Sequence, residues 1–535
     1  MLQLKPARIP IWTFYVFIGA LAVLAHRFVL SADFFMDDYP HILRHSGVIE
    51  GEWSSLKFRW LPYLLWSSAT AGDPIAHPAT LHALNLIVHI AIACLMLPIG
   101  RDFLRRGNWF DSDQTRTQAA ALGAIIFAMH PLGTEPVHYT RCLMIDLVTL
   151  FSVLTAWFAL RFSEKPNARW AIFAIAALIF ATVSKKPGFA HAAANLAIVG
   201  FVCINWSALR KLRPSGKQIL LAIPFALTGI AFAAYWIWWG IGYLGREQLL
   251  GTHALTQGRV FWIYIQQFFL PTELSSDHYV PWSMGLGDLP AVIGSLGVLV
   301  LVAGCIWMLF TKRFRILGAI LALALAPLLL RFGYVVSELV VEYRVYPALP
   351  WFGLLAGCGL IWIVKWNRAA GLSAVAVILT GFFVLSNGRS ALWTDSNLLA
   401  MDTLHAYPKN LRAITIAQQQ AQLDSQYQLV KELAFETDRM LEENEAYNAE
   451  NSDRQFEMKR VFKHWAIAHQ YAIYAIALDE GVDPAIVYAD RKIREMSDHA
   501  PWSITDENPL IMARLALVQF VALRDAQAEE TPEDT

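Results

Sequence analysis

The sequence contains few charged residues. Asp, Glu, Lys and Arg make up only 16% of its 535 positions, whereas 56% of the positions are hydrophobic. The mean hydropathy of +0.41 is too high for a soluble globular protein, so the composition excludes that class and predicts a polytopic membrane protein. The 43 basic residues balance the 43 acidic residues, and we therefore expect no nucleic acid as a partner.

Cysteine is also scarce. The five cysteines lie mostly inside apolar stretches, with no CxxC pair and no regular spacing: Cys94, Cys142, Cys203, Cys305 and Cys358. This pattern indicates neither a disulfide framework nor a zinc site. We expect no metal site and no cofactor, although the sequence leaves open whether the activity needs a divalent ion.

Long apolar runs, by contrast, are abundant. Runs of about 20 residues predict about eleven membrane-spanning helices and hence an all-α fold. They lie near residues 11–30, 81–100, 118–130, 143–162, 170–183, 188–206, 218–240, 288–310, 314–331, 345–364 and 371–387. The first run is too long for the core of a cleaved signal peptide, so we expect it to remain as a helix.

The basic residues predict the orientation of these spans. They gather in alternate connections, such as Arg101 to Arg106 and Arg210 to Lys217, which the positive-inside rule assigns to the cytoplasm. With a cytoplasmic N-terminus, the opposite face receives the loop after the first span, the HPLGTEPVH loop at 130–138, the SKKPGF turn at 184–189, and residues 241–287 and 337–344. All segments that hold candidate functional residues therefore fall on the extracytoplasmic side.

The composition changes after Asn387, where charged and polar residues with helical periodicity replace the apolar runs. We predict a membrane domain over residues 1–390, an extracytoplasmic helical domain over 391–525 and an acidic tail over 526–535. An odd number of spans places the helical domain on the extracytoplasmic face.

Two adjacent aspartates, Asp37 and Asp38, follow the first span. An aspartate at the mouth of a membrane cavity can act as a general base on an acceptor hydroxyl, and a second carboxylate can tune its pKa or hold the acceptor. The alternative is that both residues mark a helix end and are solvated.

The loop HPLGTEPVHYTR holds Glu135, His138 and Arg141. Two histidines and a carboxylate could suggest a metal, but their spacing matches no compact ligand motif and two prolines interrupt the helix that would align them. We therefore favour an acceptor-binding or structural loop.

Basic residues on the extracytoplasmic side depart from the positive-inside rule. They are Lys185, Lys186, Arg246, Arg259, Arg331 and Arg344. Such cations could bind a lipid-linked phosphate, or they could anchor lipid headgroups. In the second span, His82, Asn85 and His89 share one helix face, where they either line a cavity or form interhelical hydrogen bonds.

Several segments together resemble a known family. These are FMDDYPHIL, HPATLHALNLIVHI, HPLGTEPVHYTRCLMIDLVTLF, SKKPGF, SSDHYVP and VEYRVYPALPWFG. In this order they resemble the recurrent blocks of the TMTC-type transmembrane O-mannosyltransferases and their bacterial relatives, which are GT-C glycosyltransferases. The resemblance covers residues 10–410, and the tetratricopeptide (TPR) repeats of the family would correspond to the helical C-terminal domain.

The resemblance implies an inverting glycosyltransferase that moves one sugar from a polyprenyl-phosphate donor to a hydroxyl on the extracytoplasmic face. By matching positions it implies catalysis by Asp37 with Asp38 in support, donor-phosphate binding by Lys185, Lys186 and Arg344, and substrate binding by Glu135, His138, Arg141, Asp277 and His278. Two departures from the family pattern matter. TRCLMID replaces the usual Gly-Arg-acid sequence, and Lys186 stands where the family has an acid.

Acceptors in this family include protein Ser and Thr hydroxyls, and bacterial relatives decorate pilins, sometimes with arabinofuranose. The sequence does not choose between mannose and a pentose. The expected location is a bacterial inner membrane, with membrane lipids as further partners. The alternatives are a transporter or flippase of lipid-linked sugars, a GT-C transferase that acts on a glycan or lipid acceptor, and a scaffold anchored by its spans.

Overall fold

The computed structural model describes residues 10–51, 59–203, 247–283, 285–333, 338–407, 410–449, 455–499 and 508–530. Within these ranges the chain is helical and contains no strand. It forms two compact units. The first comprises Met1–Leu274 and Pro281–Asp395, and the second comprises Ser275–Val280 and Ser396–Thr535.

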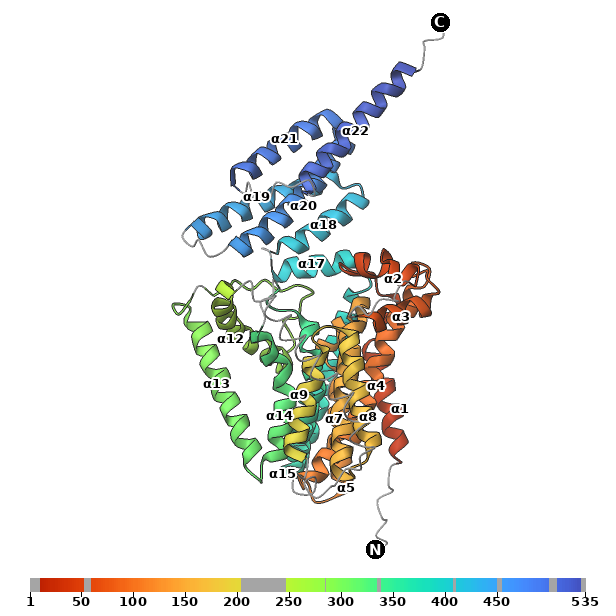
Figure 1. Cartoon of the computed structure of the whole chain (residues 1–535), viewed down its shortest axis with the longest axis vertical. Coiled ribbons are helices and arrows are strands. Elements are labelled where there is room, and N and C mark those ends of the chain that lie inside the picture. The colour runs from red at the N-terminus through yellow and green to blue at the C-terminus, as the bar shows by residue number, and fades with distance from the viewer. Residues whose placement is uncertain are drawn as a thin grey trace, which may run out of the picture. The chain divides into compact units, whose positions relative to one another are not determined.

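The first unit is a bundle of long apolar helices (Figure 1). They are α1 (Ile11–Ala25), α4 (Pro78–Arg106), α5 (Asp113–Met129), α7 (Leu143–Glu164), α8 (Ala168–Ser184), α9 (Gly188–Cys203), α12 (Glu247–Phe269), α13 (Leu289–Phe310), α14 (Arg315–Leu329), α15 (Leu349–Trp366) and α16 (Arg368–Leu392). Side-chain caps fix the start of several of them. Ser112, Asn167, Asp288 and Asn367 each accept a backbone N–H in the first turn of the helix that follows.

Each expected span that falls on described residues is largely helical, and residues 204–206 and the expected span 218–240 lie outside them. Seven segments of the described chain are long and apolar enough to cross a membrane: Ile11–Ser31, Pro78–Arg106, Thr140–Glu164, Leu289–Phe310, Arg315–Gly333, Glu342–Trp366 and Arg368–Leu392. The helices α5, α8 and α9 have 17, 17 and 16 residues and fall short of that length. Several long apolar helices are thus compatible with a multi-pass membrane protein.

Small residues allow α5 to lie at the centre of this bundle. All residues from Ala119 to Met129 are buried. A Cβ atom at Gly123 would come within 2.8 Å of the Gly353 carbonyl oxygen, and one at Gly357 within 2.5 Å of the Ala119 carbonyl oxygen. The backbones of α5 and α15 therefore approach each other closely, as in membrane helix pairs with small interface residues.

Shorter elements cap one end of the first unit. They include α2 (Ser46–Ile49), α3 (Trp60–Thr70), α6 (Thr134–His138) and the 3₁₀ segments Thr140–Cys142, Leu330–Gly333 and Glu342–Ala348. Asn85 of α4 holds the loop after α6, because its amide donates to the carbonyl oxygens of Pro136 at 2.9 Å and Tyr139 at 2.8 Å. His89 contacts the Tyr346 hydroxyl at 2.7 Å. These side chains form interhelical hydrogen bonds, which is the second of the two roles considered for them.

The second unit contains α17 (Ser396–Ala406), α18 (Leu411–Leu423), α19 (Tyr427–Ala449), α20 (Gln455–Asp479), α21 (Val482–His499) and α22 (Pro509–Glu530). Each of these helices contacts the next one along the chain, and α20 also contacts both α18 and α22. Buried Phe462, Trp465 and Met496 belong to its core. The buried imidazole of His469 contacts Asp438 at 2.8 Å and the Tyr488 hydroxyl at 2.6 Å, which links three of the helices.

A short piece of the chain between α12 and α13 belongs to the second unit. Within Ser275–Val280, the carbonyl oxygen of Asp277 accepts a hydrogen bond from the Asn410 amide at 3.0 Å. His278 contacts the Tyr407 hydroxyl at 2.8 Å. The carboxylate of Asp277 lies 3.6 Å from Arg412. Asp277 and His278, two of the residues that were expected to bind substrate, therefore have partners in the helical unit.

Candidate active site

A cavity of about 300 Å³ lies in the first unit. Most of its charged lining residues come from the short segments that connect the long helices. Its charged lining comprises six cations and two carboxylates: Arg59, Arg141, Lys185, Lys186, Arg331, Arg344, Asp37 and Glu338. Ile145, Pro187, His191, Pro327 and Tyr343 complete the wall. A surplus of positive charge in a largely apolar domain suits an anionic ligand.

The cavity brings together five of the residues that were expected at the site, Asp37, Arg141, Lys185, Lys186 and Arg344. Their separation along the chain exceeds 300 positions, so the helical packing creates this group. Two further cations were expected on the same face. Arg259 pairs with Asp288 at 3.5 Å, and Arg246 lies outside the described residues.

Asp37 faces the cavity. Its carboxylate forms an ion pair with the Arg141 guanidinium, and its side chain stays 41% exposed. Its backbone N–H donates to the Tyr139 hydroxyl at 3.0 Å. The preceding residue, Met36, has a φ of 41°, in the left-handed region that non-glycine residues seldom adopt. This sharp turn directs the two neighbouring aspartates to different environments.

Asp38 is fully buried and does not line the cavity. One carboxylate oxygen accepts the Phe35 N–H at 3.1 Å, and the other accepts the Arg141 N–H at 2.8 Å. Burial raises the pKa of Asp38 to about 8, although these N–H donors oppose the shift. Asp38 therefore ties the loop after α1 to the backbone of Arg141, the residue that pairs with Asp37.

The aromatic ring of Tyr343 organises two of the cations. Lys185 Nζ lies 4.6 Å from the ring centroid, and the guanidinium carbon of Arg344 lies 5.8 Å from it. Both distances are within the range of cation–π attraction. Arg344 also pairs with Glu338 at 2.6 Å.

The pKa of Lys185 is lower than that of an ordinary lysine. Burial, together with smaller contributions from the positive charges of Arg141, Arg344 and Arg59, lowers the pKa of Lys185 to about 7. A bound anion would favour the charged form of the amine again. A strongly shifted lysine inside a cavity is typical of a functional site.

Glu135 and His138 lie behind the cavity and not in its lining. One oxygen of Glu135 accepts the Tyr343 N–H at 2.8 Å. Burial, with a smaller contribution from the neighbouring Glu342 carboxyl, raises the pKa of Glu135 well above its ordinary value. His138 contacts the Thr134 carbonyl oxygen at 2.8 Å and the Ser390 hydroxyl at 2.6 Å. Burial lowers the pKa of His138 to about 3, so its imidazole is neutral at pH 7.

Arg59, Glu338 and Tyr343 are lining residues that the sequence did not identify. Arg59 stands directly before α3, in an aromatic-rich stretch that gives no sign of a distant partner. Tyr343 and Glu338 lie within the extracytoplasmic segment 337–344, where Arg344 attracted attention by its charge. Among the residues whose placement is described, no group of three or more His, Cys, Asp or Glu side chains could hold a metal ion.

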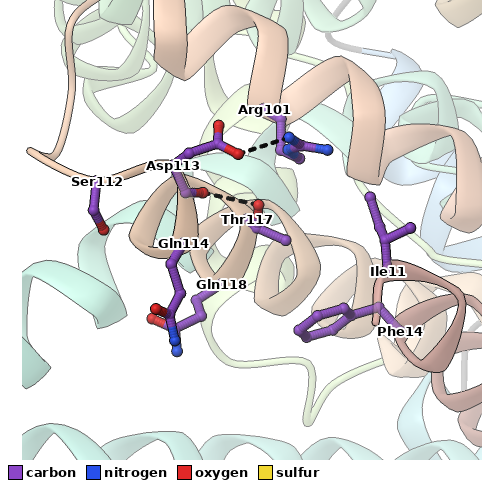
Figure 2. Close-up of a pocket in the computed structure, with 8 residues that line it drawn as sticks. All are labelled: Ile11, Phe14, Arg101, Ser112, Asp113, Gln114, Thr117 and Gln118. Carbon is purple, nitrogen blue, oxygen red and sulfur yellow. Dashed lines mark hydrogen bonds and ion pairs between the residues drawn. The ribbon is translucent and has the colours of Figure 1, made fainter. Parts of the chain in front are cut away.

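A second cavity, of about 600 Å³, lies between the start of α1 and the start of α5 (Figure 2). Its wall consists of Ile11, Phe14, Arg101, Ser112, Asp113, Gln114, Thr117 and Gln118. Arg101 and Asp113 pair at 2.8 Å, so the one cation of this lining is matched by one carboxylate. This cavity therefore lacks the positive surplus of the first.

Comparison of the chain with protein-family models, with curated proteins and with solved structures finds no match.

Proposed function

We propose that the protein is a GT-C glycosyltransferase that moves one sugar from a polyprenyl-phosphate donor to a hydroxyl group. The observation that carries this proposal is the grouping of one exposed aspartate, Asp37, with six cations in a single cavity of a membrane-type helical bundle. A phosphate-bearing lipid needs fixed positive charge at the bilayer surface, and an acceptor hydroxyl needs a base beside it.

The proposed chemistry assigns a separate task to each charge. Asp37 takes the proton from the acceptor hydroxyl as the hydroxyl oxygen attacks the anomeric carbon from the face opposite the phosphate. The bond between that carbon and the phosphate oxygen breaks, and the electron pair leaves with the polyprenyl phosphate. Arg344, Lys185 and Lys186 stabilise the charge that develops on the departing phosphate. The stereochemical result is inversion at the anomeric carbon.

Arg141 has a special place in this proposal because it already pairs with Asp37. Its guanidinium holds the carboxylate in the cavity beside the cations that would bind the donor. Asp38 supports the arrangement indirectly through its bond to the Arg141 backbone. Asp38 thus acts as a positioning residue, and Asp37 is the base.

The wider features of the family belong to the same proposal. They are about eleven spans in a bacterial inner membrane, an extracytoplasmic site, and a TPR-like helical domain that presents a protein acceptor. The sugar would be a hexose such as mannose or a pentose such as arabinofuranose, transferred to Ser or Thr, with pilin among the candidate acceptors. A transporter is less well supported, because Asn85 and His89 already form hydrogen bonds inside the bundle.

Mass spectrometry of extracytoplasmic proteins tests this function. Cells that lack the chain are complemented with the wild-type protein, with Asp37→Asn, or with Glu273→Gln as a control on an exposed carboxylate outside the cavity. We expect a hexose or pentose on at least one protein with the wild type and the control, and its absence with Asp37→Asn. A normal glycosylation level with Asp37→Asn would refute the role of Asp37 as base.

A further inference from the structure

We infer that Glu135 is a positioning residue that holds the Tyr343 backbone and thereby sets the places of Lys185 and Arg344 in the cavity. This inference deepens the proposed function and rests on it. It also gives Glu135 a different role from the substrate binding that the family resemblance implies.

The contact between Glu135 and Tyr343 joins a buried carboxyl group to a partly buried backbone amide. Glu135 is 2% exposed and does not line the cavity. Its carboxyl oxygen accepts the backbone N–H of Tyr343 at 2.8 Å, across 208 positions of sequence. The buried carboxyl of Glu135 gains a donor in this contact, and an unsatisfied buried polar group is costly.

A second link runs beside the first. Arg389 of α16 donates to the Thr134 hydroxyl at 3.1 Å and pairs with Glu342 at 2.9 Å. Thr134 and Glu135 are consecutive at the start of α6, and Glu342 and Tyr343 are consecutive at the start of the 3₁₀ segment Glu342–Ala348. The two links together form a clamp between these short elements.

The clamp acts on the cavity through an aromatic ring. Tyr343 places its ring 4.6 Å from Lys185 Nζ and 5.8 Å from the Arg344 guanidinium carbon. Cation–π attraction depends on the position of the ring, and the backbone determines that position. Loss of the Glu135 contact would therefore displace two phosphate-binding cations without removing either charge.

This role requires an acceptor oxygen at position 135 but no negative charge. A glutamine side chain supplies the same oxygen at nearly the same place. The inference thus separates Glu135→Gln, which preserves the contact, from Glu135→Ala, which removes it. A carboxylate that bound substrate directly would not tolerate glutamine in the same way.

Two measurements on the purified full-length protein test the inference. The first is hydrogen–deuterium exchange of the peptide that contains the Tyr343 amide. The second is the dissociation constant for undecaprenyl phosphate in detergent. We expect Glu135→Ala to accelerate exchange and weaken binding about tenfold, and Glu135→Gln to match the wild type in both. Glu273→Ala, on an exposed loop, serves as the matched control.

Three outcomes would overturn the inference. Glu135→Gln could weaken binding as much as Glu135→Ala, which would mean that the charge itself is needed. Glu135→Ala could leave exchange at Tyr343 unchanged, or it could accelerate exchange without any effect on binding. If Glu135→Ala does not fold, Tyr343→Ala replaces it, and undiminished binding by that variant would contradict the role of the ring.

The exchange measurement also separates this inference from the proposed function. If the wild-type protein does not bind undecaprenyl phosphate, the proposed function fails. Faster exchange in Glu135→Ala, with normal exchange in Glu135→Gln, would still support the clamp on Tyr343, and unchanged exchange would refute it.

Discussion

The two cavities of the first unit differ in how their charges are balanced. The cavity at Asp37 gathers six cations against two carboxylates, whereas the cavity at Arg101 has one cation paired with Asp113 at 2.8 Å. The second cavity is the larger of the two. Volume alone therefore does not indicate which cavity binds a charged substrate, and the surplus of charge is the better guide.

The origin of the charges differs as well. Arg101 and Asp113 lie 12 positions apart and belong to consecutive helices. The cations of the first cavity come from the position before α3, the 3₁₀ segment before α7, the turn after α8 and the 3₁₀ segments between α14 and α15. A fold that brings like charges together from so many segments loses stability through their repulsion, which an anionic ligand would offset.

Among replacements of Arg344, Lys185 and Arg101, we expect replacement of Arg344 to reduce donor affinity most. Arg344→Ala removes a guanidinium that can bind a phosphate with two parallel hydrogen bonds, and we predict a loss of donor affinity of tenfold or more. Arg344→Lys should restore only part of it, because an ammonium group lacks the planar fork. The apparent Michaelis constant for a polyprenyl-phosphate sugar measures this effect, and an unchanged value would contradict it.

We expect deprotonation of Lys185 to reduce donor affinity by a smaller factor. Its pKa of about 7 lies below that of an ordinary lysine, so its charge is present below pH 7 and is lost as the pH rises through that value. We predict that affinity for a polyprenyl-phosphate sugar, a phosphodiester of constant charge, falls about fivefold from pH 6 to pH 8.5.

Lys185→Arg provides the control for this titration, since a guanidinium stays charged throughout that range. Its binding should not change with pH. An equally steep loss of affinity in Lys185→Arg would assign the pH dependence to another group and weaken the case for Lys185.

Replacement of Arg101 should have the smallest effect. Arg101 is 30% exposed and its partner Asp113 is 62% exposed, so their pair contributes little to stability. We predict that Arg101→Ala changes donor affinity less than about twofold and the free energy of unfolding by about 0.5 kcal/mol at most. A loss as large as that of Arg344→Ala would remove the distinction between the cavities.

The sequence predicted the helices well because apolar runs are local signals. Their boundaries were also close: the expected span 288–310 corresponds to α13, Leu289–Phe310. The number of spans was harder to predict, because α8 and α9 are apolar but short and residues 218–240 are not described. Hydropathy therefore predicted the type of fold better than the number of crossings.

The sequence predicted part of the lining of the candidate site. Lys185 and Arg344 stood out because basic residues are uncommon on the extracytoplasmic side, and both line the cavity. No local signal distinguishes Asp37 from Asp38, since the turn at Met36 and the distant Arg141 N–H decide which of them is buried. Asp277 similarly belongs to the second unit because of a contact with Asn410, 133 positions away.

The most direct test of the account is a cryo-electron microscopy structure of the Asp37→Asn protein in lipid nanodiscs with a polyprenyl-phosphate sugar. This variant should retain the donor uncleaved. We predict density for the phosphate within hydrogen-bonding distance of Arg344 and Lys185, with the anomeric carbon facing residue 37. Donor density in the cavity at Arg101, or a phosphate without contact to any cation of the first cavity, would contradict the account.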